Sequence, residues 1–576
     1  MLQENLLRWE NDEYIDKDLK DILETMKSQP ETLEDAFYKH LEFGTGGMRG
    51  ELAPGTNRMN IYTVRRAAEG LALYIEDTYG EEKQKGIAVA YDSRHKSPEF
   101  AMETAKVMGA HGIPTFLFDA LRPTPELSFA IRYLKAVGGV VITASHNPPE
   151  YNGFKVYNED GGQIPPHQAK QIIEKVNKIE NELTIPVIEK SRLEELELLQ
   201  WIGGEVDQVY LEQLKGITQE RATLANRQLS IVFTPLHGTA YDLVVKGLKQ
   251  SGFEQIHIVE EQANPDPNFS TVESPNPEEH QAFTKAIELG SNVGADILIG
   301  TDPDADRLGV AAKDSEGDYK VLTGNQLGVL MLDYLLSHNQ DIPENAMMIK
   351  TIVTSEMGRA VANYYGVNTL DTLTGFKFIG EKIREFEQLG EHQFVFGYEE
   401  SYGYLIGDFA RDKDAIQSSV FASEMAAYYK EKGLTLFEAL EILYQTHGYY
   451  LEDLESMKLK GIEGAKKITE IMDSFREEPL RQAASLDVLA IEDYSARIRT
   501  HMKEGTTEAI DLPSSNVIKF ILSDDCWVCL RPSGTEPKIK FYFGMRSSNK
   551  QTSEQRLEAL KQDVMARVTQ LTFETV

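Results

Sequence analysis

Residues 138–149 read GGVVITASHNPP, a short apolar segment that runs directly into a polar turn. Its apolar residues stand at consecutive positions and include β-branched valine and isoleucine, which is typical of a strand buried on both faces of a mainly parallel sheet. Residues 295–307 (ADILIGTDPDADR) and residues 393–403 (QFVFGYEESYG) repeat this order of apolar strand and polar loop. Ligands of open parallel sheets bind beyond the carboxyl ends of the strands, so we expect the three loops to face one shared cleft.

Other apolar segments of the same kind alternate with longer helical segments, at 86–92, 115–120, 229–235 and 346–353. This alternation predicts an α/β fold with mainly parallel-type mixed sheets. Near the N-terminus, apolar residues recur at helical spacing and predict an amphipathic helix (Leu19, Ile22, Leu23 and Met26). We also predict acidic helical stretches near 170–200 and 450–480.

The last part of the chain has a different pattern. Residues 517–524, 526–532 and 538–545 predict an antiparallel sheet in a smaller C-terminal α+β domain. A chain of 576 residues is too long for one core, so several domains are expected. We predict three α/β domains at 1–205, 206–320 and 321–450, followed by the α+β domain at 451–576.

The formal net charge of −33 argues against a nucleic-acid binder and should repel anionic membranes. No apolar run approaches the ~20 residues that span a bilayer, and the N-terminus lacks the apolar region of a signal peptide, so we expect a cytoplasmic protein. Cys526 and Cys529 are the only two cysteines and cannot build a disulfide framework. In a strand they would point to opposite faces, so we interpret this C-x-x-C as structural.

Ser145 opens the first polar loop, SHNPP. Pro148 and Pro149 are expected to rigidify the turn and to hold Ser145 beyond the end of the sheet. A serine hydroxyl placed in this way can act as a covalent phosphate carrier, with His146 and Lys155 as nearby proton carriers or cations. For this segment alone, an ordinary turn is the alternative.

Asp302, Asp304 and Asp306 alternate in the second loop. In an extended chain these positions share one face, where three carboxylates repel one another unless a cation lies between them. Oxygen ligands suit Mg²⁺ or Ca²⁺, and the EF-hand pattern is excluded because Arg307 and Lys313 stand at its sixth and twelfth positions. We therefore predict a divalent metal site, with an aspartate-rich turn as the alternative.

Two further loops carry polar groups that suit a sugar phosphate. Glu399 and Ser401 in GYEESYG can bind sugar hydroxyls, and the loop RPSGTEP can cradle a phosphate through an arginine, hydroxyls and open backbone N–H groups (Arg531, Ser533, Gly534 and Thr535). In each case a plain turn is an equal alternative.

Three short motifs do not support the functions that their spelling suggests. FGTGGMRG has Arg49 where a dinucleotide fingerprint needs glycine, and residues 375–380 are not followed by the lysine and hydroxyl residue of a P-loop. Asn268-Phe269-Ser270 has the spelling of a glycosylation site, which carries no meaning without a secretion signal.

Taken together, TASHNPPEYNGFK, GTDPDADR, GYEESYG and RPSGTEPK occur in the order found in the α-D-phosphohexomutases, the phosphoglucomutase/phosphomannomutase family. The resemblance spans nearly the whole chain from Arg49 onward. FGTGGMRG, TGFKFIG and RDKD resemble the phosphoglucomutase type, whose relatives include phosphopentomutases. The resemblance implies four domains around one cleft, three of them of shared α/β topology and the fourth carrying a phosphate loop.

The resemblance also implies a role for each motif. Ser145 is implied to be the phosphoserine, which binds Mg²⁺ together with Asp302, Asp304 and Asp306. The implied catalytic residues at the reacting end are Arg49, Ser145, His146 and Lys155, with Lys413 as the candidate base. The implied substrate-binding residues are Glu399, Ser401, Arg307, Thr374, Gly375, Lys377, Arg531, Ser533, Gly534 and Thr535.

The implied reaction interconverts glucose 1-phosphate and glucose 6-phosphate through glucose 1,6-bisphosphate, which is intermediate and activator. Tyr402 and Gly403 stand where phosphomannomutase-type members carry Gly-His, which favours glucose over mannose. The alternatives are a phosphopentomutase, a phosphomannomutase, a sugar bisphosphate synthase and a non-catalytic sugar-phosphate sensor that holds a metal. We expect sugar phosphates as the only partners, no nucleic acid or membrane, and a monomer or weak homodimer.

Overall fold

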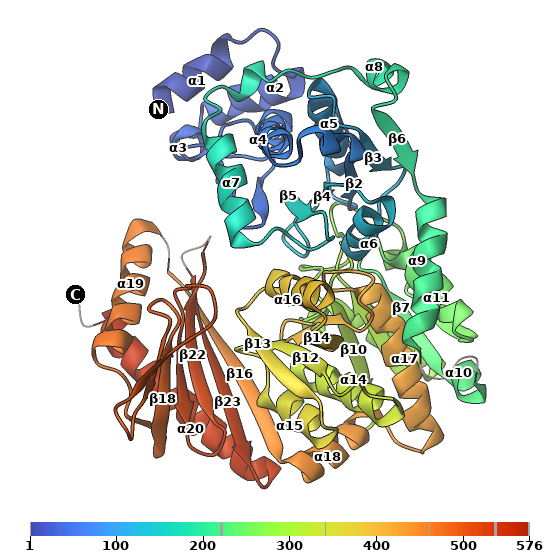
Figure 1. The fold of residues 1–576 in the computed structure, drawn as a ribbon, viewed down its shortest axis with the longest axis vertical. Helices are drawn as coiled ribbons and strands as arrows, with labels where there is room; N and C mark the ends of the chain where they lie inside the picture. Colours follow the sequence, from blue (N-terminus) through green and yellow to red (C-terminus); the bar gives the residue numbers. More distant parts are fainter. Residues whose placement is uncertain (1, 219–222, 340, 460, 535–537, 574–576) are drawn as a thin grey trace. The chain divides into compact units, whose positions relative to one another are not determined.

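The computed structural model describes residues 2–218, 223–339, 341–459, 461–534 and 538–573. The chain forms two compact units (Figure 1). The larger unit comprises Met1–Gly324 and Phe376–Thr435, and the smaller unit comprises Asn325–Gly375 and Leu436–Val576.

The first sheet of the larger unit has the strand order β1-β5-β4-β2-β3-β6. Its strands are β1 (Gly47–Glu51), β2 (Ile87–Tyr91), β3 (Thr115–Phe118), β4 (Gly138–Ile142), β5 (Tyr151–Asn158) and β6 (Leu199–Ile202). The pairs β2–β3, β2–β4 and β3–β6 are parallel, whereas β5 pairs antiparallel with β4 and β1. The mixed sheet that the sequence predicted is therefore confirmed.

Helices cover both faces of this sheet. They are α4 (Ile61–Tyr79), α5 (Ser97–Ala110), α6 (Thr124–Leu134), α7 (Pro166–Asn177) and α8 (Lys190–Glu195), with the short 3₁₀ turns Gly80–Lys85 and Glu182–Thr184. Val89 and Val140 point into a core shared with α4, α5 and α7, whereas Gly139 faces Ile131 of α6. Burial on both faces explains why the central strands β2 and β4 are apolar at every position.

The N-terminal helices are α1 (Leu2–Asn11), α2 (Lys17–Met26) and α3 (Pro30–Phe37). Leu23 and Met26 of α2 are buried with Trp9 and Phe37 in a separate small core. The predicted amphipathic helix is therefore confirmed, although Ile22 is 46% exposed and does not belong to this core.

The second sheet of the larger unit has the order β11-β10-β9-β7-β8. Its strands are β7 (Ser230–Thr234), β8 (Gln255–Ile258), β9 (Ile297–Thr301), β10 (Leu308–Lys313) and β11 (Tyr319–Val321). The associated helices are α9 (Gly204–Ile217), α10 (Leu224–Gln228), α11 (Tyr241–Gln250), α12 (Glu260–Ala263) and α13 (Thr284–Val293), with the 3₁₀ turn His280–Phe283. β7 is parallel to β8 and β9, and β10 returns antiparallel to β9.

The segment from Phe376 to Thr435 completes the larger unit. It contains α16 (Phe376–Leu389), β14 (Gln393–Glu399), β15 (Gly403–Leu405) and α17 (Ala415–Glu431). α17 is buried along almost its whole length and packs against α11 and α10. This packing fixes the segment that carries Glu399 and Lys413 relative to the second sheet.

The smaller unit contains a parallel pair of strands, β12 (Ala346–Thr351) and β13 (Asn368–Thr372), with α14 (Gly324–His338), α15 (Glu356–Tyr364) and α18 (Leu436–His447). Its C-terminal sheet has the order β16-β23-β22-β21-β18-β19-β20, and β17 pairs with β18. The strands are β16 (Tyr449–Lys458), β17 (Gln482–Ala483), β18 (Leu486–Asp493), β19 (Ile498–His501), β20 (Thr507–Ala509), β21 (Ile518–Leu522), β22 (Trp527–Pro532) and β23 (Lys538–Ser547). α19 (Gly461–Glu477) and α20 (Lys550–Phe573) pack with this sheet around one apolar core (Figure 1).

The helix predicted near 450–480 is confirmed by α19 over Gly461–Glu477, but its predicted start is wrong. Residues 449–458 form strand β16 instead of the start of an acidic helix. All ten residues pair antiparallel with β23, from Tyr449 opposite Ser547 to Lys458 opposite Lys538. The backbone pairing with a strand about ninety residues later outweighs the local charge pattern, because strand preference depends on the neighbouring strand.

Cys526 and Cys529 are both buried and form no disulfide bond with each other. Among the described helices, none combines the length and the apolar character needed to cross a bilayer.

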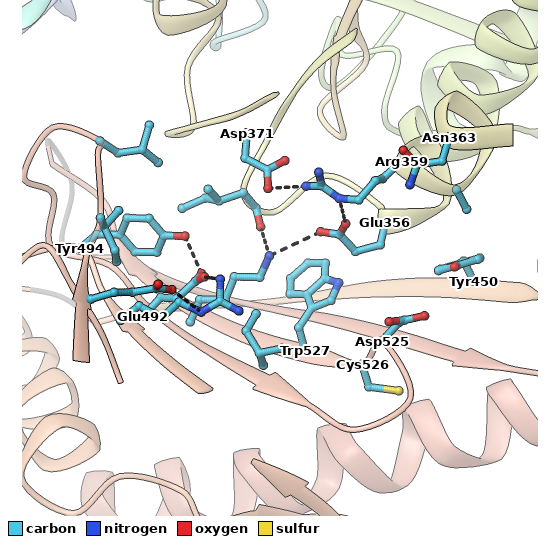
Figure 2. Close-up of a pocket in the computed structure, with 18 of the residues that line it drawn as sticks. Glu356, Arg359, Asn363, Asp371, Tyr450, Glu492, Tyr494, Asp525, Cys526 and Trp527 are labelled. Atoms are coloured by element: carbon cyan, nitrogen blue, oxygen red, sulfur yellow. Dashed lines mark hydrogen bonds and ion pairs between the residues drawn. The ribbon is translucent and has the colours of Figure 1, made fainter. Parts of the chain in front are cut away.

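A cavity of about 650 Å³ lies between α15 and the C-terminal sheet of the smaller unit (Figure 2). Its charged lining is paired internally: Arg359 Nε lies 2.8 Å from Glu356, and Lys519 Nζ lies 3.7 Å from the same carboxylate. Lys519 also lies over the ring of Trp527, 4.7 Å from the centroid. None of the site residues predicted from the sequence is among the described residues that line this cavity, so we treat it as a structural ion-pair network.

Glu452 of β16 has an unusual electrostatic position. Ser355 Oγ donates to its carboxylate, and Asn325 Nδ2 lies 3.3 Å from it. Burial raises the pKa of Glu452 to about 7, against the hydrogen bond from Ser355 and with a further contribution from nearby Glu356. A carboxyl group with a raised pKa in the folded state stabilises the fold while it is protonated, and this contribution is lost as the pH rises from its ordinary value near 4.5 to about 7.

We expect Glu452→Gln, which stays neutral, to remove this pH dependence. At pH 5 the variant should match the wild type, and at pH 8 its unfolding free energy should exceed the wild-type value by about 2 kcal/mol. Urea unfolding at both pH values measures the difference. Glu463→Gln, at an exposed position on α19, is the matched control. An equal difference between variant and wild type at the two pH values would contradict the raised pKa.

Candidate functional site

Ser145 lies in the loop that follows β4, in the larger unit. Its Oγ donates a 2.6 Å hydrogen bond to Asp302 Oδ2 and lies 3.2 Å from His146 Nδ1. Ser145 lies beyond the end of β4, as expected, but the residue is only 8% exposed. Its hydroxyl faces inward, toward the loop after β9.

The backbone of Ser145 is held in a conformation that serine rarely adopts. Its φ is +51°, in the left-handed region, which costs about 1–3 kcal/mol for a residue other than glycine. The N–H of Ser145 donates to Thr143 Oγ1 at 2.8 Å, and its carbonyl accepts from Arg94 at 2.6 Å. The surrounding structure therefore fixes both sides of the residue.

The three aspartates follow β9 in a tight turn. The N–H of Ala305 donates to Asp302 O at 2.9 Å, and Ala305 has φ +56°. The predicted clustering is present, with one oxygen from each carboxylate within 4.8 Å of the others. Its predicted cause, an extended chain with alternating side chains, is wrong, because the turn brings the carboxylates together.

The carboxylate oxygens of the three aspartates differ in their hydrogen-bond partners. Asp302 Oδ1 accepts the N–H groups of Asp306 and Arg307 at 3.1 and 3.0 Å. Asp304 Oδ2 accepts from Thr124 Oγ1 at 3.0 Å and from Lys155 Nζ at 2.8 Å. Asp304 Oδ1 and Asp306 Oδ1 are buried and have no hydrogen-bond partner among the described residues. Buried oxygens of this kind fit a hard cation such as Mg²⁺, which prefers carboxylate ligands.

The local charges shift the pKa values of the carboxylates in different directions. Burial and the neighbouring Asp306 and Asp304 raise the pKa of Asp302 well above its ordinary value. Burial also acts on Asp304, but Lys155 and the hydrogen bonds from its neighbours outweigh it and lower the pKa of Asp304. A divalent cation would relieve the mutual repulsion that the lysines compensate only in part.

Basic residues surround the cluster. Lys413 Nζ lies 3.2 Å from Asp306 Oδ2 and 3.0 Å from Asp412 Oδ1, and Tyr157 donates to Asp412 Oδ2 at 2.8 Å. Burial opposes the charge on Lys413, but Asp306 and Asp412 outweigh it and raise the lysine pKa. Lys155, Lys413 and the carboxylates form one buried, hydrogen-bonded charge network.

Two further predicted residues flank the serine and the metal loop. Arg307 pairs with Glu278 and lies 3.8 Å from Asp306 Oδ1 through its Nε. Arg49 of β1 donates to Asn147 Oδ1 at 3.0 Å, next to the serine. Burial, followed by the positive charge of Arg307, lowers the pKa of His146 well below its ordinary value, so that its ring is neutral at pH 7.

The loop after β14 is joined to the metal loop. The N–H of Leu308 donates to Tyr402 O at 3.0 Å, and the N–H of Ala415 donates to Ala305 O at 3.1 Å. Glu399 is buried at the end of β14. A Cβ at Gly403 would lie 2.1 Å from the side chain of Lys413, so this glycine makes room for that lysine.

Not every predicted site residue belongs to this group. Lys377, at the start of α16, donates to Thr45 Oγ1 at 2.9 Å, which joins TGFKFIG to the FGTGG loop. The smaller unit carries Thr374, Gly375, Arg531, Ser533 and Gly534. Thr535 lies outside the described residues.

In the smaller unit, Arg531 is the penultimate residue of β22 and lies opposite Lys540 of β23, and the N–H of Ser533 donates to Lys538 O at 2.7 Å. The end of this hairpin therefore carries three basic residues, of which the sequence interpretation used only Arg531.

The sequence interpretation also missed the residues that hold the serine loop, above all Asp92 and Arg94. They lie in the loop after β2, which is parallel to β4. The signal was present in the sequence, because this polar DSR segment follows an apolar strand in the same way as the three loops that were selected.

Comparison with known proteins places these loops in one family. Models of the phosphoglucomutase/phosphomannomutase α/β/α domains I, II and III match residues 40–183, 208–317 and 323–446, and the model of the C-terminal domain matches residues 483–564. The chain belongs to the phosphoglucomutase/phosphomannomutase family. The predicted family and the predicted α/β class with a sheet-rich C-terminal domain are thereby confirmed.

Members of the family named phosphoglucomutase are similar along most of the chain. The Staphylococcus aureus protein is 41% identical over 528 residues, which cover 91% of this chain and 93% of that protein. The Staphylococcus epidermidis protein is 41% identical over 505 residues, which cover 88% and 90%.

Solved structures share the fold of the family. The phosphoglucomutase parafusin from Paramecium, in an open form, has a TM-score of 0.66 at 19% identity and covers 93% of this chain and 96% of its own. A family protein from Burkholderia thailandensis has a TM-score of 0.65 at 19% identity and covers 92% and 97%.

Proposed function

We propose that this protein is a phosphoglucomutase, an isomerase that interconverts glucose 1-phosphate and glucose 6-phosphate. The observation that carries the proposal is Ser145 Oγ at 2.6 Å from Asp302, within a cluster of three buried carboxylates. Full-length similarity to proteins named phosphoglucomutase supports the same activity. A non-catalytic sugar-phosphate sensor would not need a strained serine next to a metal site.

In the proposed reaction, Ser145 carries a phosphoryl group. The bond between phosphorus and Ser145 Oγ breaks while a hydroxyl of the bound sugar phosphate attacks phosphorus. A base takes the hydroxyl proton, and Ser145 Oγ keeps the bond electrons and takes up a proton. The product is glucose 1,6-bisphosphate, which turns end for end and returns its other phosphate to Ser145. Glucose 1,6-bisphosphate therefore also serves as an activator that phosphorylates unphosphorylated Ser145.

We propose that Asp302, Asp304 and Asp306 hold Mg²⁺ together with an oxygen on Ser145. When bound, Mg²⁺ would neutralise charge on the transferring phosphoryl group. Arg49, Lys155 and Arg307 supply positive charge near the same oxygen, where the phosphoryl group would lie. These cations also explain how an acidic protein can bind an anionic substrate.

Two residues are candidates for the base, His146 and Lys413. His146 is neutral at pH 7 and lies 3.2 Å from Ser145 Oγ, which suits a proton acceptor near the reacting oxygen. Lys413 is the base that the family resemblance implies, but a protonated lysine cannot accept a proton. We propose that Lys413 acts as the base only when positive charge at the carboxylates lowers its pKa.

The remaining residues are assigned to the sugar and to the phosphate that does not react. We propose that Glu399 and Ser401 bind sugar hydroxyls. The proposed phosphate-binding and contact residues are Arg531, Ser533, Gly534, Thr535, Thr374, Gly375 and Lys377. Arginine suits this role because its planar fork can grip two phosphate oxygens at once.

We expect glucose 1-phosphate to be the preferred substrate among hexose and pentose 1-phosphates. The position of Gly403 against Lys413 supports a glucose-type site, since the Gly-His of the mannose type is absent here. A coupled assay with glucose, mannose and ribose 1-phosphates, each at saturating Mg²⁺ and bisphosphate, measures the preference as kcat/KM. A ribose rate well above the glucose rate would instead assign the protein as a phosphopentomutase.

A further inference from the structure

Four backbone carbonyls of the serine loop converge on one buried guanidinium group, that of Arg94. Its NH2 donates to Ser145 O at 2.6 Å and to Asn147 O, and its NH1 donates to Pro148 O at 2.7 Å and to Tyr151 O at 2.9 Å. Arg94 is 2% exposed; three of the four acceptors lie in the turn between β4 and β5, and the fourth, Tyr151, is the first residue of β5. One side chain therefore defines the path of the whole turn.

The guanidinium group is itself held from two sides. Asp92 Oδ2 lies 3.4 Å from Arg94 Nε, and the N–H of Arg94 donates to Asp92 Oδ1 at 2.9 Å. The ring of Phe269, from the domain of the second sheet, lies 4.9 Å from the guanidinium carbon. His95 Nε2 also lies 2.8 Å from Asn268 Oδ1.

The contact with Phe269 gives a structural role to residues 268–270, whose sequence has the pattern of a glycosylation site. Asn268-Phe269-Ser270 forms a turn in which Asp266 accepts the N–H groups of Asn268 and Ser270, each at 2.9 Å. Phe269 has φ +48° and is 1% exposed. The turn presents the phenyl ring to Arg94, so the second domain contacts the clamp that shapes the serine loop.

We propose that Arg94 is a positioning residue for the phosphoryl transfer: it imposes the left-handed backbone of Ser145 and so aims the serine oxygen at the metal site. This inference rests on the proposed function. The backbone on either side of the Ser145 Cα is fixed, by Thr143 Oγ1 at the N–H and by Arg94 at the carbonyl. The side-chain torsion of Ser145 is the only torsion of this residue that these two backbone hydrogen bonds do not restrict.

Arginine is required here because of its shape. Its planar group directs several donors along fixed directions, so that two nitrogens serve four carbonyls. Lysine has one nitrogen and cannot reach the four acceptors at once. The two prolines of the loop set φ at their own positions, but they do not set φ at Ser145.

The test compares Arg94→Met and Arg94→Lys with the wild type. For Arg94→Met we expect kcat to fall by about a hundredfold with KM changed by less than about threefold, because a misplaced nucleophile slows the step without weakening substrate binding. Arg94→Lys should have about a tenth of the wild-type kcat or less, because lysine restores the positive charge but not the planar set of hydrogen-bond donors. Phosphate on Ser145, measured by intact mass, should form more slowly from added glucose 1,6-bisphosphate in both variants.

Amide hydrogen exchange tests the clamp without any turnover. The N–H of Asn147 donates to Ala144 O and the N–H of Tyr151 donates to Pro148 O, both at 3.1 Å. These amides should exchange at least about tenfold faster in both Arg94 variants. Arg66→Met is the matched control, because Arg66 is 6% exposed and donates to Ile179 O at 3.1 Å in the same domain.

The outcomes separate this inference from the proposed function. A wild type that neither carries phosphate on Ser145 nor converts sugar phosphates would overturn the proposed function, whatever the exchange rates show. An active wild type with an Arg94→Met variant that keeps a third of its kcat would overturn the positioning role. An equal loss of kcat in Arg66→Met, or unchanged exchange at Asn147 and Tyr151 in Arg94→Lys, would overturn it too.

Discussion

Ser145→Ala should abolish turnover while leaving the fold intact. Removal of the nucleophile of a covalent mechanism lowers kcat by at least about 10⁴-fold, since no other group can carry the phosphoryl group. The variant also loses the 2.6 Å hydrogen bond to Asp302, which should cost about 1–2 kcal/mol of unfolding free energy at most. The protein should therefore remain folded at room temperature.

The measurement combines activity, intact mass and thermal unfolding. The wild type should gain one phosphate from glucose 1,6-bisphosphate, and Ser145→Ala should gain none. Ser423→Ala is the matched control, because Ser423 is fully buried and its hydroxyl donates to Ser419 O within α17 at 2.8 Å. If Ser145→Ala kept most of its activity, or still took up phosphate, the serine would not be the carrier.

Removal of the metal should have the second-largest effect. We expect a chelator to stop the reaction and added Mg²⁺ to restore it, because Asp304 Oδ1 and Asp306 Oδ1 lie buried with no hydrogen-bond donor in the described part of the chain. Asp304→Asn should raise the Mg²⁺ concentration for half-maximal activity by about tenfold or more, since one carboxylate charge at short range to the cation is lost.

Thermal unfolding provides a readout of binding that is independent of turnover. A ligand that binds only the folded state at a hundred times its Kd stabilises it by about 2.7 kcal/mol, so Mg²⁺ should raise the wild-type Tm. The rise should be reduced in Asp304→Asn and unchanged in Asp318→Asn, a control that removes one exposed carboxylate from the β10–β11 hairpin. Full activity in excess chelator, with no effect of Mg²⁺ on the Tm, would exclude the metal role.

The sequence was sufficient for the buried apolar strands and for three of the polar loops that follow them. Segments such as 138–142 and 297–300 are apolar at every position, because both faces of each strand are covered by helices. Local composition was therefore enough to predict the fold class. Ser145 and the three aspartates could be selected because polar groups at the ends of such strands have few structural reasons to be there.

Only the tertiary structure decided how these groups are held. Arg94 reaches Ser145 across 51 residues, and Ser145 reaches Asp302 across 157, so neither pairing leaves a local pattern. The same holds for β16, whose acidic sequence predicted a helix and whose strand conformation depends on pairing with β23. The sequence predicted that the three carboxylates cluster, but the turn after β9, and not their spacing in an extended chain, brings them together. Which of their oxygens point to lysines and which remain open to a cation depends on a turn and on Lys155 and Lys413, which other segments bring in.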